Sequence, residues 1–278
     1  MSQISGIDQP LIDVLCRDIH KIHEQSDQLL KKWRSGPKKY RKKINQNGQA
    51  DVVTSLDFAI ERLIISILGN RMPIFGEELS EFSSIGESPL YAIVDPIDGT
   101  KEFFGGGSEW GISISIIHLQ KPTISSIYLP DRGEKFLAVK GQGVKLNGQQ
   151  YVRKKQTMNN KIAVSPRQIK HPHLSKKISD IGYNAHPVPA LTPKICAILR
   201  GDVEMAVYIP QTNQSAAIWD YAAAPLLLSE IGGCITSCDG QDLSFDIGFF
   251  NHTEGWVASS NSTAHSELVE SFKNSRLT

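Results

Sequence analysis

The hydrophobic periodicity of this chain changes near residue 90, and the change limits the folds open to it. Residues 9–34 carry apolar side chains at mixed three- and four-residue spacings, which predict an amphipathic helix. A second helix is expected over 55–69. From Leu90 the pattern becomes typical of strands, because Leu90–Val94 is a short apolar run and 110–118 alternates. The chain is therefore expected to begin with helices and to continue into a sheet.

The alternating segment 110–118 places isoleucines on one side and serines on the other, which predicts a half-buried strand. We expect it to pair with 123–129 and 135–139 in an antiparallel sheet. Beyond about residue 155, shorter strands alternate with helices: a strand at 162–165, helices near 172–181 and 191–200, a strand at 205–209 and a helix over 219–231. This outline predicts an antiparallel-sheet half, residues 1–155, packed against an α/β half, residues 156–278.

The composition is that of an ordinary soluble globular protein, with 278 residues, 40% hydrophobic and 21% charged. A formal net charge of +1 gives no global field that would favour nucleic acid or an anionic membrane. No stretch approaches the roughly 20 apolar residues of a membrane span, and the first thirty residues hold no apolar signal-peptide core. Four scattered cysteines without a C-x-x-C pair predict reduced thiols in a cytoplasmic protein.

Two aspartates, Asp95 and Asp98, directly follow the first apolar strand. Pro96 fixes φ at about −65° and Gly99 permits a tight bend, so we expect the segment to turn sharply. Such a turn can aim both carboxylates and the Ile97 carbonyl oxygen at one point, and these are the ligands that Mg²⁺ requires. A capped turn, with Asp98 bonding the backbone ahead of it, is the structural alternative.

Three further acidic segments lie beside apolar ones. Glu77-Glu78 follows Ile74-Phe75, Asp57 lies in the first turn of the second helix, and Asp220 begins the late helix. Asp57 and Asp220 could each simply offset a helix dipole, worth about 0.3–1 kcal/mol. Carboxylates crowded at the edge of a core cost several kcal/mol each unless a cation, hydrogen bonds or protons compensate. The four acidic segments together favour a metal site.

Three of these segments resemble the signatures of the inositol monophosphatase superfamily: Gly76-Glu77-Glu78, Asp95-Pro96-Ile97-Asp98-Gly99-Thr100 and Trp219-Asp220-Tyr221-Ala222-Ala223. The resemblance covers the chain from about Asp51 to Asn261. Thr100-Lys101-Glu102-Phe103 resembles the 3′(2′),5′-bisphosphate nucleotidase branch of the CysQ type, and so does Gln211-Thr212-Asn213. The family implies an α/β (α+β) layered sandwich of alternating helices and sheets, an active site between the two halves, and a homodimer.

By this resemblance, two or three Mg²⁺ ions are held by the Ile97 carbonyl and four carboxylates, those of Glu77, Asp95, Asp98 and Asp220. Thr100, with Asp57 as its partner, resembles the pair that orients the attacking water. A threonine hydroxyl can pass on a proton only if a carboxylate accepts from it, so the pairing is chemically sensible.

Other site positions carry alternatives. Glu78 is expected to act through water on a weak third ion, or else to be an exposed acid. The amides of Gly99 and Thr100 would bind phosphate oxygens at the start of a helix. Lys194 matches the family lysine of the substrate pocket and could contact a second phosphate, or it is a surface lysine. Pro193 and a missing Gly-Ser pair depart from the family pattern there.

The implied activity is Mg²⁺-dependent hydrolysis of a small-molecule phosphate monoester by a metal-activated water, inhibited by lithium. The nucleotidase branch makes adenosine 3′,5′-bisphosphate the expected substrate; inositol monophosphate and histidinol phosphate are the alternatives. A haloacid-dehalogenase phosphatase is disfavoured, because its Asp-x-Asp-Gly-Thr motif has one residue between the aspartates and this chain has two. A nucleic-acid-binding protein using the basic run Lys38–Lys43 is a further alternative, although a solvated loop explains that run more simply.

Overall fold

The computed structural model describes residues 7–44, 50–79, 88–153, 160–210, 216–246, 251–252 and 255–273. The elements of the first half are α1 (Gln9–Ser35), β1 (Tyr40–Ile44), β2 (Ala50–Thr54), α2 (Ser55–Leu68), β3 (Ile74–Gly76), β4 (Leu90–Asp98), α3 (Thr100–Phe104), β5 (Gly111–His118), β6 (Lys121–Leu129), a 3₁₀ turn (Pro130–Arg132), β7 (Glu134–Val139), β8 (Val144–Leu146) and β9 (Gln149–Tyr151). Those of the second half are β10 (Lys161–Val164), α4 (Pro166–Ile169), α5 (Pro172–Asp180), β11 (Asn184–Pro187), α6 (Leu191–Arg200), β12 (Met205–Tyr208), β13 (Ala216–Ala217), α7 (Ile218–Tyr221), α8 (Ala224–Ser229), β14 (Cys234–Ser237), β15 (Asn251–His252), β16 (Trp256–Ser259) and α9 (Ser262–Phe272).

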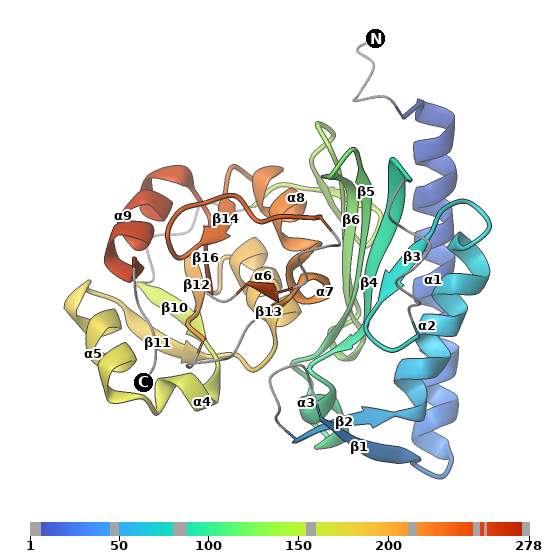
Figure 1. Cartoon of the computed structure of the whole chain (residues 1–278), viewed down its shortest axis with the longest axis horizontal. Coiled ribbons are helices and arrows are strands. Elements are labelled where there is room, and N and C mark those ends of the chain that lie inside the picture. The colour runs from blue at the N-terminus through green and yellow to red at the C-terminus, as the bar shows by residue number, and fades with distance from the viewer. Residues whose placement is uncertain are drawn as a thin grey trace.

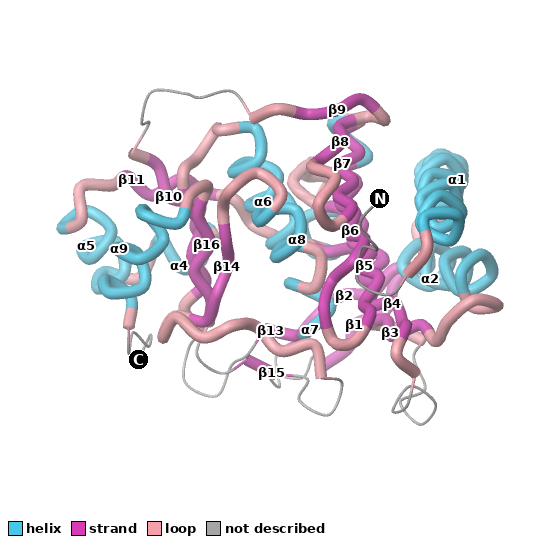
Figure 2. The backbone as a smooth tube through the Cα atoms, turned by 90° about the horizontal axis from the view of Figure 1, so that it is seen from above, coloured by secondary structure: helices cyan, strands magenta, loops and turns pink. Residues whose placement is uncertain are grey.

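Helices and sheets alternate in five layers across the molecule (Figures 1 and 2). Helices α1 and α2 cover one face of a seven-stranded sheet of order β3-β4-β5-β6-β7-β8-β9. Helices α6 and α8 fill the space between it and a five-stranded sheet of order β11-β10-β12-β16-β14. Helices α5 and α9 cover the outer face of the second sheet. This layering confirms the predicted sandwich, with a largely antiparallel first sheet and a mixed second one.

Local signals explain the two N-terminal helices. Asp8 caps α1, because its carboxylate accepts a hydrogen bond from the Leu11 amide at 2.9 Å. Thr54 caps α2 in the same way and forms a reciprocal capping box with Asp57. Both helices bury one apolar stripe against the first sheet, as the periodicity predicted. Within the described residues, no helix is both long and apolar enough to cross a membrane.

Strand β5 is buried on both faces, so the prediction of a half-buried strand is wrong. Ser113 and Ser115 are 1% and 0% exposed. Their face of the sheet is covered by the helical layer that contains α6, which lies far away in sequence. Ser115 satisfies its hydroxyl by a 2.9 Å hydrogen bond to the Ser125 hydroxyl on β6. Serine here is a small buried residue rather than a sign of solvent.

Two other predicted elements are also wrong. The single helix expected over 219–231 is two short helices, α7 and α8, because Pro225 lacks an amide hydrogen and cannot continue the first one. The basic run Lys38–Lys43, interpreted as a solvated loop, contributes most of strand β1, which pairs antiparallel with β2. The division of the chain at residue 155 into two domains stays a prediction.

Candidate active site

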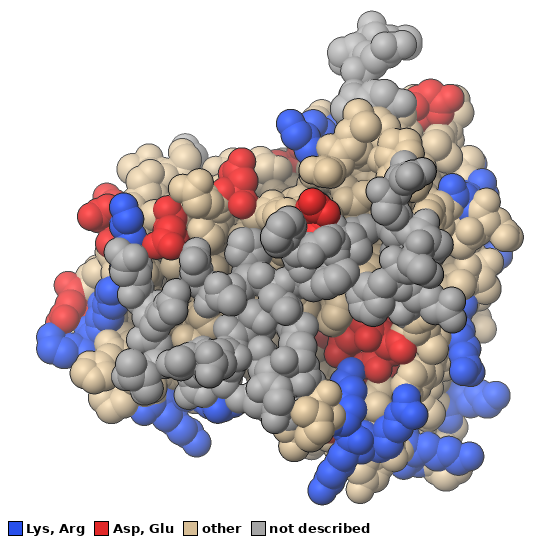
Figure 3. All heavy atoms as spheres, in the orientation of Figure 1, with Lys and Arg blue, Asp and Glu red and all other residues tan. Residues whose placement is uncertain are grey.

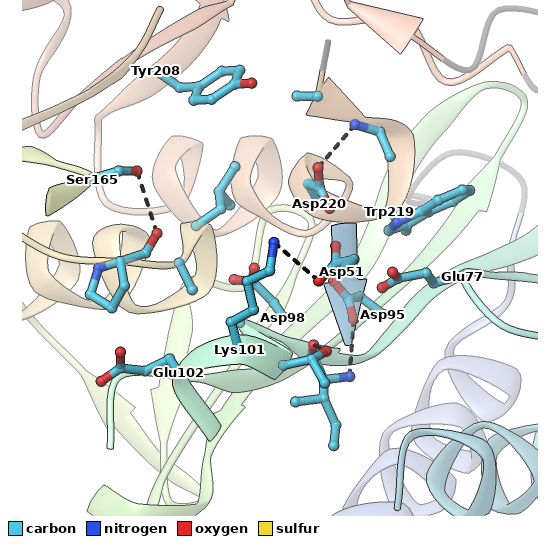
Figure 4. A pocket seen from close by; sticks show the side chains of 18 of the residues that line it. Asp51, Glu77, Asp95, Asp98, Lys101, Glu102, Ser165, Tyr208, Trp219 and Asp220 are labelled. Carbon is cyan, nitrogen blue, oxygen red and sulfur yellow. Dashed lines mark hydrogen bonds and ion pairs between the residues drawn. The ribbon is translucent and has the colours of Figure 1, made fainter. Parts of the chain in front are cut away.

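A cavity of about 750 Å³ lies where the end of β4 meets the second half of the chain. Its lining comes from the first half at β1, β2, the segment after β3, the end of β4 and α3, and from the second half at α4, α6, α7 and β12. Figure 4 shows this pocket from close by, with Glu77, Asp95, Asp98 and Asp220 around one part of it. In Figure 3 acidic atoms gather on this face next to basic ones. The structure therefore brings together the carboxylates that the sequence pointed to.

The acidic end of β4 is a β-bulge, not the sharp turn expected after Val94. Strand β4 continues to Asp98, and its register against β5 shifts between Asp95, opposite Ser113, and Asp98, opposite Gly111. The extra residue falls at Pro96-Ile97, where proline has no amide hydrogen to give to the ladder. The bulge re-aims the strand, so that both aspartates line the same pocket.

Gly99 lets the chain leave β4 and enter α3. Its φ is +90°, in the left-handed region, and a Cβ there would lie 2.8 Å from the Ala190 Cβ. Glycine is required on both grounds. Thr100 follows as the first residue of α3 and lines the pocket with Gly99. The predicted contacts of Gly99 and Thr100 with a phosphate stay predictions.

Hydrogen bonds from the backbone fix three of the carboxylates. Asp95 Oδ1 accepts from the Ile97 amide at 2.9 Å, and Asp220 Oδ2 accepts from the Ala217 amide at 2.9 Å. Asp98 accepts from the Thr192 amide at the start of α6, which joins the two halves of the chain. Each carboxylate keeps further lone pairs that could bind a cation.

Burial and mutual repulsion make these carboxylates hard to ionise. Burial raises the pKa of Asp95 well above its ordinary value, and the charges of Glu77, Asp98 and Asp220 raise it further. Burial, with Asp98 beside it, raises the pKa of Asp220 to about 7. Burial raises the pKa of Asp98 as well. A cation in the pocket would relieve both effects at once.

The Glu77-Glu78 segment reaches the site because β3 pairs in parallel with β4, with Gly76 opposite Val94. This register sets Glu77 beside Asp95. The ammonium of Lys43, on β1, lies 2.8 Å from Glu77 Oε1 and also contacts Glu78. The Glu78 side chain is 5% exposed, so the alternative of an exposed acid is wrong.

Thr100 and Asp57 lie in hydrogen-bond contact, although they are far apart in sequence. The Thr100 hydroxyl is 3.0 Å from Asp57 Oδ1 and 3.0 Å from the Ile97 carbonyl oxygen. The other oxygen of Asp57 accepts from the Thr54 hydroxyl at 2.6 Å and the Thr54 amide at 2.9 Å. Asp57 is fully buried, and burial raises its pKa to about 6. Asp57 is thus held rigidly toward Thr100.

Lys194 is 2% exposed, so the surface-lysine alternative is wrong. Its ammonium donates to the Ser165 hydroxyl at 3.0 Å and the Ala190 carbonyl at 3.1 Å. Burial lowers its pKa to about 8, against the opposing effect of Asp98. Lys194 lines the pocket, with Ser165 at the start of α4 on one side and the charges of Asp98 and Asp220 near it. Its contact with a phosphate stays a prediction.

The far side of the pocket was missed at the level of sequence. Arg167 and His171, on and just after α4, line it together with Tyr208 of β12 and Trp256 of β16. Figure 4 places Ser165 and Tyr208 across the cavity from Glu77. No local pattern marks these residues, because they meet only when the second sheet forms. The Gln211-Thr212-Asn213 segment lies outside the described residues.

The donor set fits Mg²⁺, although no ion forms part of the structure. Carboxylate and carbonyl oxygens are the ligands that this ion prefers, and the repulsion among them calls for positive charge. Across the described ranges, no three acidic, histidine or cysteine side chains are yet close enough to enclose one ion. Glu77 faces Lys43 instead. Binding would require these side chains to turn toward the cation.

Comparison with known proteins agrees with this geometry. Residues 15–277 match the model of the inositol monophosphatase family. An inositol monophosphatase of Mesembryanthemum crystallinum is 27% identical over 248 residues, which are 84% of this chain and 87% of that protein. The Nus factor SuhB of Xylella fastidiosa is 27% identical over 209 residues, or 72% of this chain and 74% of that protein.

The fold is also that of a solved structure. A protein described as an IMPase/NADP phosphatase, crystallised with NADP and Ca²⁺, superposes with a TM-score of 0.80 at 18% identity, covering 97% of this chain and 98% of that one. A second structure described as an IMPase/NADP phosphatase, crystallised with Mg²⁺ and phosphate, gives a TM-score of 0.76 at 19% identity, covering 96% of each chain. At this identity the likeness concerns the fold.

Proposed function

Since this chain belongs to the inositol monophosphatase family and is a phosphatase of phosphate monoesters, we propose that it removes the 3′-phosphate of adenosine 3′,5′-bisphosphate, giving AMP and phosphate. The observation that carries this proposal is the pocket itself, which has carboxylates on one side and Arg167, Tyr208 and Trp256 on the other. In a substrate with two phosphates and a base, the reacting phosphate matches the carboxylate side, and the base and second phosphate match the other side. Lys101-Glu102-Phe103, the extension typical of the nucleotidase branch, begins in the same pocket wall.

In this proposal Glu77, Asp95, Asp98, Asp220 and the Ile97 carbonyl hold Mg²⁺, two or three ions in all. Bound Mg²⁺ supplies charge neutralisation and polarises the phosphoryl oxygens. The acidic side chains become good ligands when they ionise together, which the cation makes favourable. Glu78 would act through a water molecule on the weak third ion. Lys43 balances the acidic charge before the ions bind.

Thr100 and Asp57 form the proposed proton path. Asp57 accepts a hydrogen bond from the Thr100 hydroxyl. A lone pair of the Thr100 oxygen can then accept a hydrogen bond from the attacking water. The bonds from Thr54 hold Asp57 in place during this exchange. The pair therefore orients the water and receives its proton.

The far wall would hold the rest of the substrate. Arg167 can bind a second phosphate in bidentate fashion, and Tyr208, which stacks on the buried Trp256, offers an aromatic ring to a base. Lys194, between the two walls, would face the substrate between its phosphates. Inositol monophosphate has no second phosphate for Arg167 to bind.

Inositol monophosphate is the second candidate, because curated relatives such as the Mesembryanthemum protein carry that activity in their names. The test is phosphate release in Mg²⁺ from adenosine 3′,5′-bisphosphate, inositol 1-phosphate and histidinol phosphate at equal concentrations. We expect the highest kcat/KM for the bisphosphate, and Arg167→Ala should remove most of that preference. Equal or higher kcat/KM for inositol 1-phosphate would overturn the nucleotidase assignment and leave the phosphatase chemistry intact.

A further inference from the structure

Glu61 is a fully buried acid on α2, one helical turn after Asp57. Its side chain does not line the pocket. Both of its oxygens accept hydrogen bonds from the backbone that follows β3: Oε2 from the Glu78 amide at 2.8 Å and Oε1 from the Leu79 amide at 2.9 Å. Glu61 thus occupies the same helix as the proton acceptor Asp57 but faces the segment that carries Glu77.

Gly76 leaves the space through which Glu61 reaches this backbone. A Cβ on Gly76 would lie only 2.1 Å from Glu61 Oε1, and 3.0 Å from Val94 Cγ2. Gly76 is the last residue of β3, so beyond it the chain has left the strand ladder. The Glu61 carboxylate takes over as the acceptor for the next amides.

The Glu77-Glu78 segment is therefore held from two sides by different means. Lys43 contacts the two side chains, and a cation bound by Glu77 would have to replace that contact. Glu61 accepts from the main-chain amides of Glu78 and Leu79, so these bonds persist whichever partner the Glu77 carboxylate takes. Glu77 must exchange the ammonium of Lys43 for a metal ion if it is to act as a ligand. This exchange requires a backbone that stays fixed and a side chain that can change its partner.

We propose that Glu61 is a positioning residue for the metal site: it fixes the backbone of residues 77–79 so that the Glu77 carboxylate faces Asp95 and Mg²⁺. The inference rests on the proposed role of Glu77 as a ligand. Partners that orient a ligand typically change metal affinity by about 10–100-fold when they are removed. Glu61 should therefore affect Mg²⁺ affinity without adding charge to the pocket.

The test is Mg²⁺ binding by the whole chain, measured by titration calorimetry with Mg²⁺ alone and no substrate. Glu61→Leu removes both acceptors and should raise the dissociation constant by about 10–100-fold. Glu61→Gln keeps one acceptor oxygen and should give a smaller increase. Gly76→Ala places a methyl group against the Glu61 carboxylate and should also weaken Mg²⁺ binding. This variant tests the proposal if Glu61→Leu does not fold.

Ile64→Val is the matched control, because Ile64 is buried one turn after Ile60 on the same helix and its side chain has no polar atom that could accept a hydrogen bond from the 77–79 backbone. It should lower the melting temperature and leave the Mg²⁺ dissociation constant unchanged. Glu77→Gln separates the two proposals. If it loses Mg²⁺ affinity while the Glu61 and Gly76 variants bind as the wild type does, the inference is overturned and the proposed function stands. Wild-type affinity in Glu77→Gln would remove Glu77 from the ligand set, and this role for Glu61 with it.

Discussion

Asp95 is the residue where the demands of folding and of chemistry conflict most strongly. It is 1% exposed, and four neighbouring carboxylates add repulsion to its burial. Folding alone would favour a neutral side chain at this position. The hydrogen bond that it accepts from the Ile97 amide needs only a carbonyl-type oxygen. The proposed role as a Mg²⁺ ligand, rather than stability, accounts for an aspartate here.

Asp95→Asn should therefore abolish turnover and leave the protein as stable as before, or more so, in the absence of Mg²⁺. The amide oxygen can still accept from Ile97, while the repulsion with the neighbouring acids disappears. Removing a residue that only orients a metal ligand lowers activity by up to roughly 100-fold, and the loss in Asp95→Asn should be larger. Phosphate release and urea unfolding without Mg²⁺ measure the two effects.

Asp180→Asn is the control for that substitution, since Asp180 is exposed and pairs with the exposed Lys176 one turn away. Neither activity nor stability should change by a measurable amount. Activity of Asp95→Asn within a few-fold of the wild type would remove Asp95 from the site. A marked loss of stability would show that its charge is already compensated without a metal ion.

Sequence reasoning located the carboxylates of the site but not the residues that hold them. Asp95, Asp98 and Asp220 stand at the ends of apolar segments, which is a local signal. Lys43 could not be found in this way, because its contact with Glu77 spans 34 residues and depends on how β1 packs. Glu61 did leave a signal that was overlooked: an acid one turn after Asp57 on a helix with a buried stripe.

At the scale of elements, the junction between β2 and α2 is the most closely specified. Thr54 ends the strand and caps the helix; its hydroxyl accepts from the Leu56 amide at 3.1 Å and donates to Asp57 at 2.6 Å. Thr54 is 1% exposed, so water cannot replace these bonds. The same residue therefore starts a helix and orients the carboxylate that faces Thr100.

Thr54→Ala should destabilise the protein by about 1–2 kcal/mol, at the upper end of the range for lost helix caps, because a buried carboxylate also loses a donor. Thr54→Ser keeps the hydroxyl and should recover most of the loss. The urea midpoint at constant m-value measures both. Equal stability of the alanine variant and the wild type would mean that the Asp57 backbone bond alone maintains the cap.

The wrong predictions for β5 and β1 share one cause, whereas the break between α7 and α8 lies at Pro225, a signal within the segment itself. The helices α1 and α2 have their signals within the segment itself, in caps and apolar stripes. The second covered face of β5 depends on α6, some 80 residues later, and strand β1 exists only because β2 pairs with it. Burial on a second face and pairing of a polar strand are decided by partners that a local pattern does not contain.

At the scale of the whole molecule, the five layers leave α1 as the outermost cover of the first sheet. Its apolar stripe contains one histidine, His23, which is 2% exposed and packs on Tyr128 with ring centroids 5.0 Å apart. The His23 Nε2 lies 3.2 Å from the Ser126 hydroxyl of β6. Burial lowers the pKa of His23 to about 3, helped by the charge of Lys135. The helix–sheet interface is thus built for a neutral imidazole.

The contribution of His23 to the free energy of unfolding should consequently fall as the medium is acidified. An unfolded histidine takes up a proton near pH 6.5, whereas folded His23 does so only near pH 3, so between these values the unfolded state binds more protons. The contribution of His23 is fully present above about pH 6.5 and decreases by about 1.4 kcal/mol per pH unit below it. From pH 7 to pH 5 this amounts to about 2 kcal/mol.

Other groups also titrate in this range, so the effect of His23 has to be read as a difference between variants. His23→Gln keeps a polar atom for Ser126 and cannot be charged; its stability at pH 7 should be lower, but its loss between pH 7 and pH 5 should be about 2 kcal/mol smaller than that of the wild type. His20→Gln, on the exposed side of the same helix, should keep the wild-type slope, because that side chain is 64% exposed. Urea unfolding at a series of pH values gives all three slopes. If His23→Gln and the wild type lose stability in parallel, the α1–sheet interface already admits a charged imidazole, and the acid sensitivity of the molecule arises elsewhere.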